Sequence, residues 1–164
     1  MKGDKVSKFI LRGSLIFTLI CLPIFLLRKK PSIKDWLLAY LFNGITNGFI
    51  DNVLASHKLL QYPVRYLPKT FKSNVLFDFL VYPTFTVFFN QLTDKDKPKT
   101  ILLKLLAFTV PTTLFEYLIE KNTNLLKWNK KWKWYHTLIS MTLKSLVTRG
   151  VVGCVRKISD KQNK

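Results

Sequence analysis

Acidic residues, cysteine, histidine and glycine are scarce in this chain, and each shortage argues against a class of protein. Nine Asp and Glu stand against 27 Lys and Arg in 164 residues, which gives a formal net charge of +18. Cys21 and Cys154 do not form the disulfide framework of a small secreted domain. The two histidines belong to no Cys/His cluster with zinc spacing, and there is no phosphate-binding glycine loop or serine elbow. We therefore expect no metal, no cofactor and no enzymatic activity.

The chain also lacks a long apolar run that is free of charge. Each apolar stretch is close to the length of about 20 residues that crosses a bilayer. The pattern predicts one all-α domain over residues 1–164, an integral membrane up-and-down bundle of four to five transmembrane helices. The predicted spans are residues 9–27, 35–56, 74–92, 100–120 and 134–155.

The first stretch is the weakest of these spans. A basic segment before 15 apolar residues is typical of a signal peptide, but no small-residue cleavage site follows, so we expect a retained anchor. Pro23 lies within it, and a peripheral or half-inserted helix is the alternative. Five spans place 13 basic residues on the N-terminal side against 11, whereas four spans place 15 against 9 and favour cytoplasmic termini. We expect a multi-pass protein of the plasma membrane with a cytoplasmic N-terminus.

Polar residues recur every four positions in the last four stretches, so each predicted helix has one polar side. A charge in hydrocarbon costs from about 3 to more than 10 kcal/mol, so these sides are expected to converge. Four embedded acids and four embedded bases, Arg12 among them, nearly cancel. The candidate intramembrane polar network consists of Asn43, Asn47, Asp51, Asp78, Lys104, Glu116, Glu120, Lys144 and Arg149.

Three functions fit this network. In the first, carboxylates bind a cation or proton and lysines act as counter-ions, in a transport-like or accessory role. In the second, the protein is a structural or interaction module whose ion pairs only hold the helices together, while its basic loops bind anionic lipid or a partner subunit. In the third, His136 and Glu116 serve as acid and base of an intramembrane enzyme that acts on lipid.

Two further motifs concern contacts. Gly44 and Gly48 lie one turn apart, which favours close helix packing within the chain or in a homo-oligomer or with another helical partner. Aromatic residues alternate with lysines between the fourth and fifth stretches, a pattern that also occurs in single-stranded nucleic-acid binding. Beside an apolar helix it indicates instead an interfacial belt at the lipid bilayer, on anionic headgroups, with no nucleic acid. The belt residues are Trp128, Trp132, Trp134 and Tyr135.

The order of these motifs also suggests a family. An Asn/Gly-rich second stretch is followed by Tyr82-Pro83, by Glu116 and Glu120, and by a Lys/Trp-rich loop before a last helix with an embedded base. Over residues 35–150 this resembles the small, functionally uncharacterised multispanning membrane proteins of spore-forming Firmicutes. The resemblance implies a four-helix membrane unit in a bacterium, and it implies no substrate, cofactor or catalytic residue.

Overall fold

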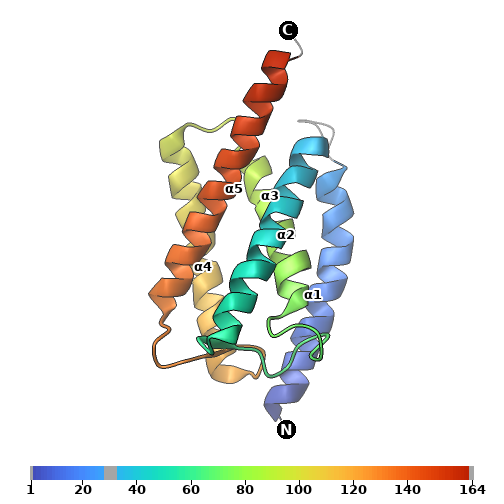
Figure 1. The fold of residues 1–164 in the computed structure, drawn as a ribbon, viewed down its shortest axis with the longest axis vertical. Coiled ribbons are helices and arrows are strands. Elements are labelled where there is room, and N and C mark those ends of the chain that lie inside the picture. Colours follow the sequence, from blue (N-terminus) through green and yellow to red (C-terminus); the bar gives the residue numbers. More distant parts are fainter. Residues whose placement is uncertain (1, 28–32, 163–164) are drawn as a thin grey trace.

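The computed structural model describes residues 2–27 and 33–162, and within them the chain is mostly helical. Five α-helices run alternately up and down, so α1 begins at the end of the bundle opposite to where α5 finishes (Figure 1). The prediction of an all-α chain is confirmed. The helices are α1 (Lys2–Leu26), α2 (Ile33–Ser56), α3 (Tyr82–Leu92), α4 (Pro98–Asn122) and α5 (Trp134–Gln162).

Three of the described helices are long and apolar enough to cross a membrane, namely Gly3–Leu26, Pro98–Asn122 and Trp134–Gln162. The first stretch, which we expected to be the weakest span, forms the helix with the highest mean hydropathy of the three. Pro23 lies inside α1 without ending it. α2 has 24 residues but is not one of these three helices, and α3 alone has 11 residues.

A π-helical turn, η1 (Phe77–Val81), leads directly into α3, where Pro83 follows. Proline has no N–H and leaves the carbonyl four residues earlier without its usual helical donor. That carbonyl belongs to Phe79, and it accepts a hydrogen bond of 2.7 Å from the Tyr40 hydroxyl of α2. The wide turn is thus fixed to the neighbouring helix, and it presents Asp78 to the interior of the bundle.

The distribution of side chains is the reverse of that in a soluble protein. The buried residues include 16 that are polar or charged and 14 that are hydrophobic, whereas large apolar side chains are exposed along four of the helices. α2 shows the division most clearly, because its buried side carries Asn43 and Asn47. Its exposed side carries a continuous apolar stripe formed by Leu37, Leu41, Ile45, Phe49 and Val53. This arrangement suits helices that pack their polar sides together inside an apolar environment.

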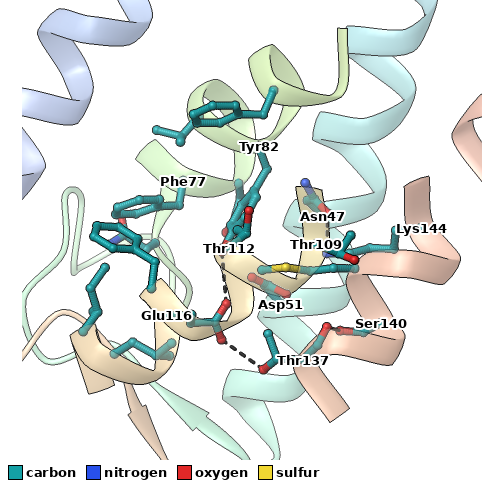
Figure 2. A pocket seen from close by; sticks show the side chains of 18 of the residues that line it. Asn47, Asp51, Phe77, Tyr82, Thr109, Thr112, Glu116, Thr137, Ser140 and Lys144 are labelled. Carbon is teal, nitrogen blue, oxygen red and sulfur yellow. Dashed lines mark hydrogen bonds between the residues drawn. The ribbon is translucent and has the colours of Figure 1, made fainter. Parts of the chain in front are cut away.

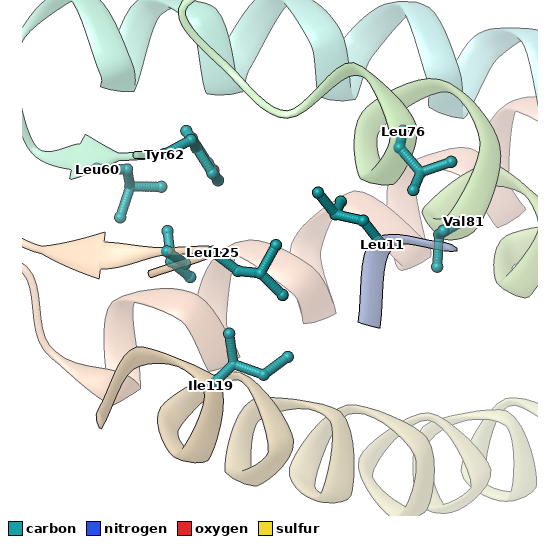
Figure 3. Packing of buried hydrophobic residues seen from close by; sticks show 8 residues of the cluster. Leu11, Leu60, Tyr62, Leu76, Val81, Ile119 and Leu125 are labelled. Carbon is teal, nitrogen blue, oxygen red and sulfur yellow. The ribbon is translucent and has the colours of Figure 1, made fainter. Parts of the chain in front are cut away.

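One end of the bundle is closed by a hydrophobic cluster beneath two crossing loops (Figure 3). The short strands β1 (Leu60–Gln61) and β2 (Lys127–Trp128) pair in antiparallel fashion, with Leu60 opposite Trp128. Their pairing joins the loop after α2 to the loop after α4. The cluster consists of Leu11, Leu60, Tyr62, Leu76, Val81, Ile119, Leu125 and Leu126.

The other end of the bundle is held by charged groups and by a small hydrophobic cluster of Trp36, Ala39, Val87 and Val152. Arg156 of α5 bridges Asp35 of α2 at 3.0 Å and Asp94, in the turn after α3, at 2.6 Å. Arg149 donates to the backbone carbonyls of Thr93 and Asp94, at 2.8 and 3.2 Å. These contacts join α2, the turn after α3 and α5. The charge of Arg156 is balanced by two carboxylates, and the Arg149 guanidinium donates to backbone carbonyls.

Gly44 and Gly48 pack within the chain, where α2 crosses η1 and the start of α3. A Cβ added to Gly48 would lie 2.2 Å from Cζ of Phe79, and one added to Gly44 would lie 3.4 Å from Cγ of Pro83. Only a residue without a side chain therefore fits at position 48 while the Phe79 ring keeps its place.

We predict that Gly48→Ala lowers the free energy of unfolding by about 1–3 kcal/mol, because the added methyl group overpacks the contact with Phe79. Gly150→Ala is the matched control, since a Cβ there meets nothing within 4 Å and should add stability through helix propensity alone. Thermal unfolding of the purified protein in detergent measures both. Equal stabilisation by the two substitutions would contradict the close contact.

Candidate functional site

A cavity of about 570 Å³ lies inside the bundle, next to the end that the hydrophobic cluster closes. This volume is in the range of about 300–1,000 Å³ that is usual for small-molecule sites. All five helices and η1 contribute to its wall, and polar side chains from α2, α4 and α5 face the same space (Figure 2). The charged residues of the wall are Asp51, Asp78, Glu116 and Lys144.

The wall formed by α2 carries three polar residues at a spacing of four, which places them above one another. The Asn47 amide donates to Oδ1 of Asn43 at 2.8 Å, and Oδ1 of Asn47 accepts a hydrogen bond of 2.5 Å from Nζ of Lys144. The Lys144 ammonium is therefore held by an amide, and none of the ion pairs in the described part of the chain joins it to a cavity carboxylate. Lys144 also lies 5.8 Å from the centre of the Tyr82 ring.

Asp51 stands at the lower end of the same wall and accepts a hydrogen bond of 3.1 Å from the Tyr62 hydroxyl. Tyr62 lies in the loop after β1 and is buried. Burial, together with the negative charge of Asp51, raises the pKa of the Tyr62 phenol well above its ordinary value. The phenol therefore stays protonated and remains a donor to Asp51.

Glu116 of α4 is held by two hydroxyl groups. Its Oε2 accepts from the Tyr82 hydroxyl at 3.2 Å, and its Oε1 accepts from Oγ1 of Thr137 at 3.1 Å. The Thr137 hydroxyl in turn accepts from Nε1 of Trp132 at 3.0 Å. Because an indole N–H can only donate, these hydrogen bonds run in one direction, from Trp132 through Thr137 to the Glu116 carboxyl group. Figure 2 shows the bond between Thr137 and Glu116.

Asp78 is completely buried, and neither of its carboxyl oxygens makes a hydrogen bond to the described residues. Asp51 and Ser73 lie beside its carboxyl group without meeting the distance and angle of a hydrogen bond. The side-chain polar atoms of Ser73 and Asn74 are likewise buried without a partner among the described residues. A buried polar group without a partner costs about 1–3 kcal/mol, so this cluster holds unused hydrogen-bonding capacity beside the cavity.

The structure brings together six of the nine residues of the candidate network, Asn43, Asn47, Asp51, Asp78, Glu116 and Lys144. The other three, Lys104, Glu120 and Arg149, do not line the cavity. Lys104 pairs with Asp96 at 2.7 Å and is half exposed. It is twelve residues before Glu116, which is about 18 Å along a helix, so the two cannot meet.

The expected balance of four acids and four bases is therefore absent from the cavity. Its wall has three carboxyl groups against the single ammonium group of Lys144. Arg12 is exposed on α1, and Lys104 and Arg149 act at the opposite end of the bundle. The backbone carbonyl of Glu120 accepts a hydrogen bond from Lys127, one turn beyond the cavity.

The four aromatic residues expected to form an interfacial belt lie in two different environments. Trp134 and Tyr135 are exposed, whereas Trp128 packs on the hydrophobic cluster and on Tyr117. Trp132 turns inward and lines the cavity. The indole hydrogen bond of Trp132 to Thr137 gives it a place in the site that its spacing in the sequence did not indicate.

His136 is held at the start of α5, where its Nδ1 accepts a hydrogen bond of 3.1 Å from the backbone N–H of Lys133. Its ring packs between Trp132 and Tyr135, and it does not line the cavity. The structure thus does not bring His136 to Glu116. The described residues also contain no group of three or more His, Cys, Asp and Glu that could hold a metal ion.

Sequence reasoning missed the functional groups that lie in the loops. Tyr62 and Ser73 belong to the connection between α2 and η1, where no helical periodicity assigns a side chain to a face. Their signal was a large aromatic residue and a small polar residue in a loop that must return to the bundle. Asn74 begins the predicted span 74–92, and its spacing of four residues from Asp78 was a signal for the same face. No known protein family, curated protein or solved structure matches this chain.

We predict opposite effects on stability from the same substitution at two cavity carboxyl groups. Glu116→Leu should lower the free energy of unfolding by about 1–3 kcal/mol, because it leaves the hydroxyls of Tyr82 and Thr137 without their acceptor. Asp78→Leu should leave it unchanged or raise it, because a buried carboxyl group without hydrogen bonds is removed. Thermal unfolding in detergent measures both, and an equal loss at Asp78 would show that this residue holds the helices together.

Proposed function

We propose that this chain is a multi-pass integral membrane protein of the bacterial plasma membrane that binds a cation in its interior cavity, in a transport-like or accessory role. One observation carries the proposal. Three carboxyl groups gather around one cavity with a single ammonium group, inside a bundle whose outer surface is apolar. A cation bound there would compensate the excess of acidic groups and use the free carboxyl oxygens of Asp78.

The apolar exterior supports a membrane position for α2 as well as for the three helices that are long and apolar enough to span on their own. α2 is 24 residues long, and its exposed stripe from Leu37 to Val53 is as apolar as the outer sides of its neighbours. Its polar residues Asn43, Asn47 and Asp51 lie on the side that faces the cavity, which lipid would not contact. α3 with η1 is the shortest unit and packs against both α1 and α2. We therefore propose five spans, with the N-terminus in the cytoplasm.

The ion pairs at the opposite end of the bundle show what a structural role looks like, and the charged groups of the cavity differ from them in a way that supports ligand binding. Where charges hold helices together, at the end near Arg156, each acid has a base within 3.0 Å. At the cavity, Lys144 donates to Asn47, Glu116 accepts from hydroxyl groups, and Asp78 has no hydrogen bond among the described residues. The structural interpretation therefore fits the Arg156 end, whereas the cavity fits a ligand.

The test of this proposal is equilibrium binding of methylammonium and of Na⁺ to the protein reconstituted in lipid nanodiscs. We expect binding of at least one of the two, and a loss of affinity of about tenfold or more with Asp51→Asn, Asp78→Asn or Glu116→Gln. Glu120→Gln is the matched control, since this acid is one turn further along α4 and does not line the cavity. Absence of binding, or an equal loss with Glu120→Gln, would contradict the proposal.

The number of spans makes a separate prediction. With five spans the two ends of the chain lie on opposite sides of the membrane, whereas with α1 at the surface they lie on the same side. We expect a membrane-impermeant reagent applied to intact cells to label a tag at the C-terminus and to leave a tag at the N-terminus unlabelled. Labelling of both tags, or of neither, would rule out five spans.

A further inference from the structure

We propose that the cavity opens sideways between α1 and α4 and accepts an amphipathic organic amine. The ammonium group would reach the carboxyl groups, and the apolar part would lie along the phenyl rings toward the opening. This inference rests on the cation-binding function proposed above and narrows the chemistry of the ligand.

The cavity has two unlike parts. The carboxyl, amide and ammonium groups lie on α2, on η1 and at Asn74 before it, on α5 and at Glu116 of α4, whereas phenyl rings come from α1, α3 and α4. Phe17, Phe85 and Phe108 form a continuous row across these three helices, with ring centres 6.1 and 5.8 Å apart. A metal ion bound by the protein needs a compact shell of oxygen atoms. A space of about 570 Å³, which is room for roughly 20 water-sized groups, fits an organic molecule instead.

The outward-facing part of the cavity wall lies on two helices only. Gly13 and Phe17 of α1 and Pro111 and Phe115 of α4 line the cavity and are also exposed at the surface. Phe17 is 49% exposed and Phe115 is 55% exposed. α1 packs chiefly on η1 and α3, and α4 packs chiefly on α5 and β2, so α1 and α4 are not joined by an extensive contact. The cavity therefore has its opening where these two helices face each other.

A ligand cannot enter along the axis of the bundle from the end that lies next to the cavity, because this end is closed. The hydrophobic cluster beneath the cavity fills this end with Leu60, Leu125 and Leu126, and the paired strands β1 and β2 cross below it. The surface that flanks the lateral opening is apolar, with Ile16 and Ile20 exposed on α1 and Leu114 on α4. A ligand that reaches the opening through lipid must itself partition into lipid, so an apolar tail is expected.

The carboxyl groups of the wall determine the chemistry of the polar end of the ligand. Three carboxyl groups favour an ammonium group, and the phenyl rings add cation–π attraction. The hydroxyls of Tyr62, Tyr82 and Thr137 already donate to Asp51 and Glu116 and are not free for a carboxylate ligand, which the three carboxyl groups of the wall also disfavour. A fatty acid of the same length would therefore bind more weakly than the amine.

The test measures the binding of dodecylamine, propylamine and dodecanoate to the protein in nanodiscs at equal free aqueous concentration. Binding to the Asp51→Asn/Asp78→Asn/Glu116→Gln variant is subtracted, because it measures simple partition into lipid. We expect carboxyl-dependent binding of dodecylamine to exceed that of propylamine by about tenfold or more. We expect dodecanoate to show no carboxyl-dependent binding. Binding of dodecanoate as strong as that of dodecylamine would contradict an acidic site for an amine.

The opening itself is tested by Gly13→Trp, with Gly150→Trp as the matched control. An added Cβ meets nothing within 4 Å at either glycine, so both variants should fold, but only Gly13 lines the cavity. We expect Gly13→Trp to slow the association of dodecylamine by about tenfold and Gly150→Trp to leave it unchanged.

The outcomes separate the two proposals. If neither amine binds through the carboxyl groups, the cation-binding function and the lateral opening both fail. If propylamine binds as well as dodecylamine, and Gly13→Trp changes neither rate, the cation-binding function stands and the amphipathic ligand with its lateral opening is wrong.

Discussion

The arrangement of this bundle depends on one constraint: every helix must turn its polar side away from an apolar exterior. Thr, Asn and Ser residues are buried in large numbers, while Leu, Ile, Val and Phe cover the outside. Hydrophobic burial between helices is concentrated in two clusters, one at the loop end and a smaller one formed by Trp36, Ala39, Val87 and Val152. The helices are also joined by close contacts such as Gly48 with Phe79 and by polar contacts such as Tyr40 with the Phe79 carbonyl.

The same constraint acts differently at the two ends of the interior. Near Arg156 the partly buried acids are paired with the arginine, and this end resembles ordinary structural ion pairing, although Nε of Arg149 and one Nη of Arg156 have no partner among the described residues. Around the cavity the acids outnumber the base, and Asp78 has no hydrogen bond among the described residues. An arrangement that leaves buried polar groups without partners is unfavourable for stability and is typical of a functional site. Unpartnered polar atoms occur at both ends, so the excess of carboxyl groups over the single ammonium group at the cavity is the physical basis of the proposed ligand site.

The helices, and the convergence of their polar sides, could be predicted from periodicity alone. The spacing of Asn43, Asn47 and Asp51 places them on one face whatever the rest of the chain does. Periodicity gives the face of a residue but not its height in the bundle, so Lys104 and Glu116 of α4 were placed in one network although twelve residues separate them. It also says nothing about loops, which is why Tyr62 and the inward turn of Trp132 were not anticipated. The basic start and internal proline of α1 predict a weak span, whereas its helix has the highest mean hydropathy of the three apolar helices.

The central claim is that the cavity carboxyl groups form a ligand site reached from the apolar side of the bundle. The most direct measurement is mass-spectrometric mapping of carboxyl modification by a lipid-soluble carbodiimide, with and without dodecylamine, in protein reconstituted into lipid. The account predicts modification of at least one of Asp51, Asp78 and Glu116, and protection of that residue by the amine, while modification of Glu120 does not respond to the amine. Cavity carboxyl groups that remain unmodified, or whose modification is insensitive to the amine, would contradict it.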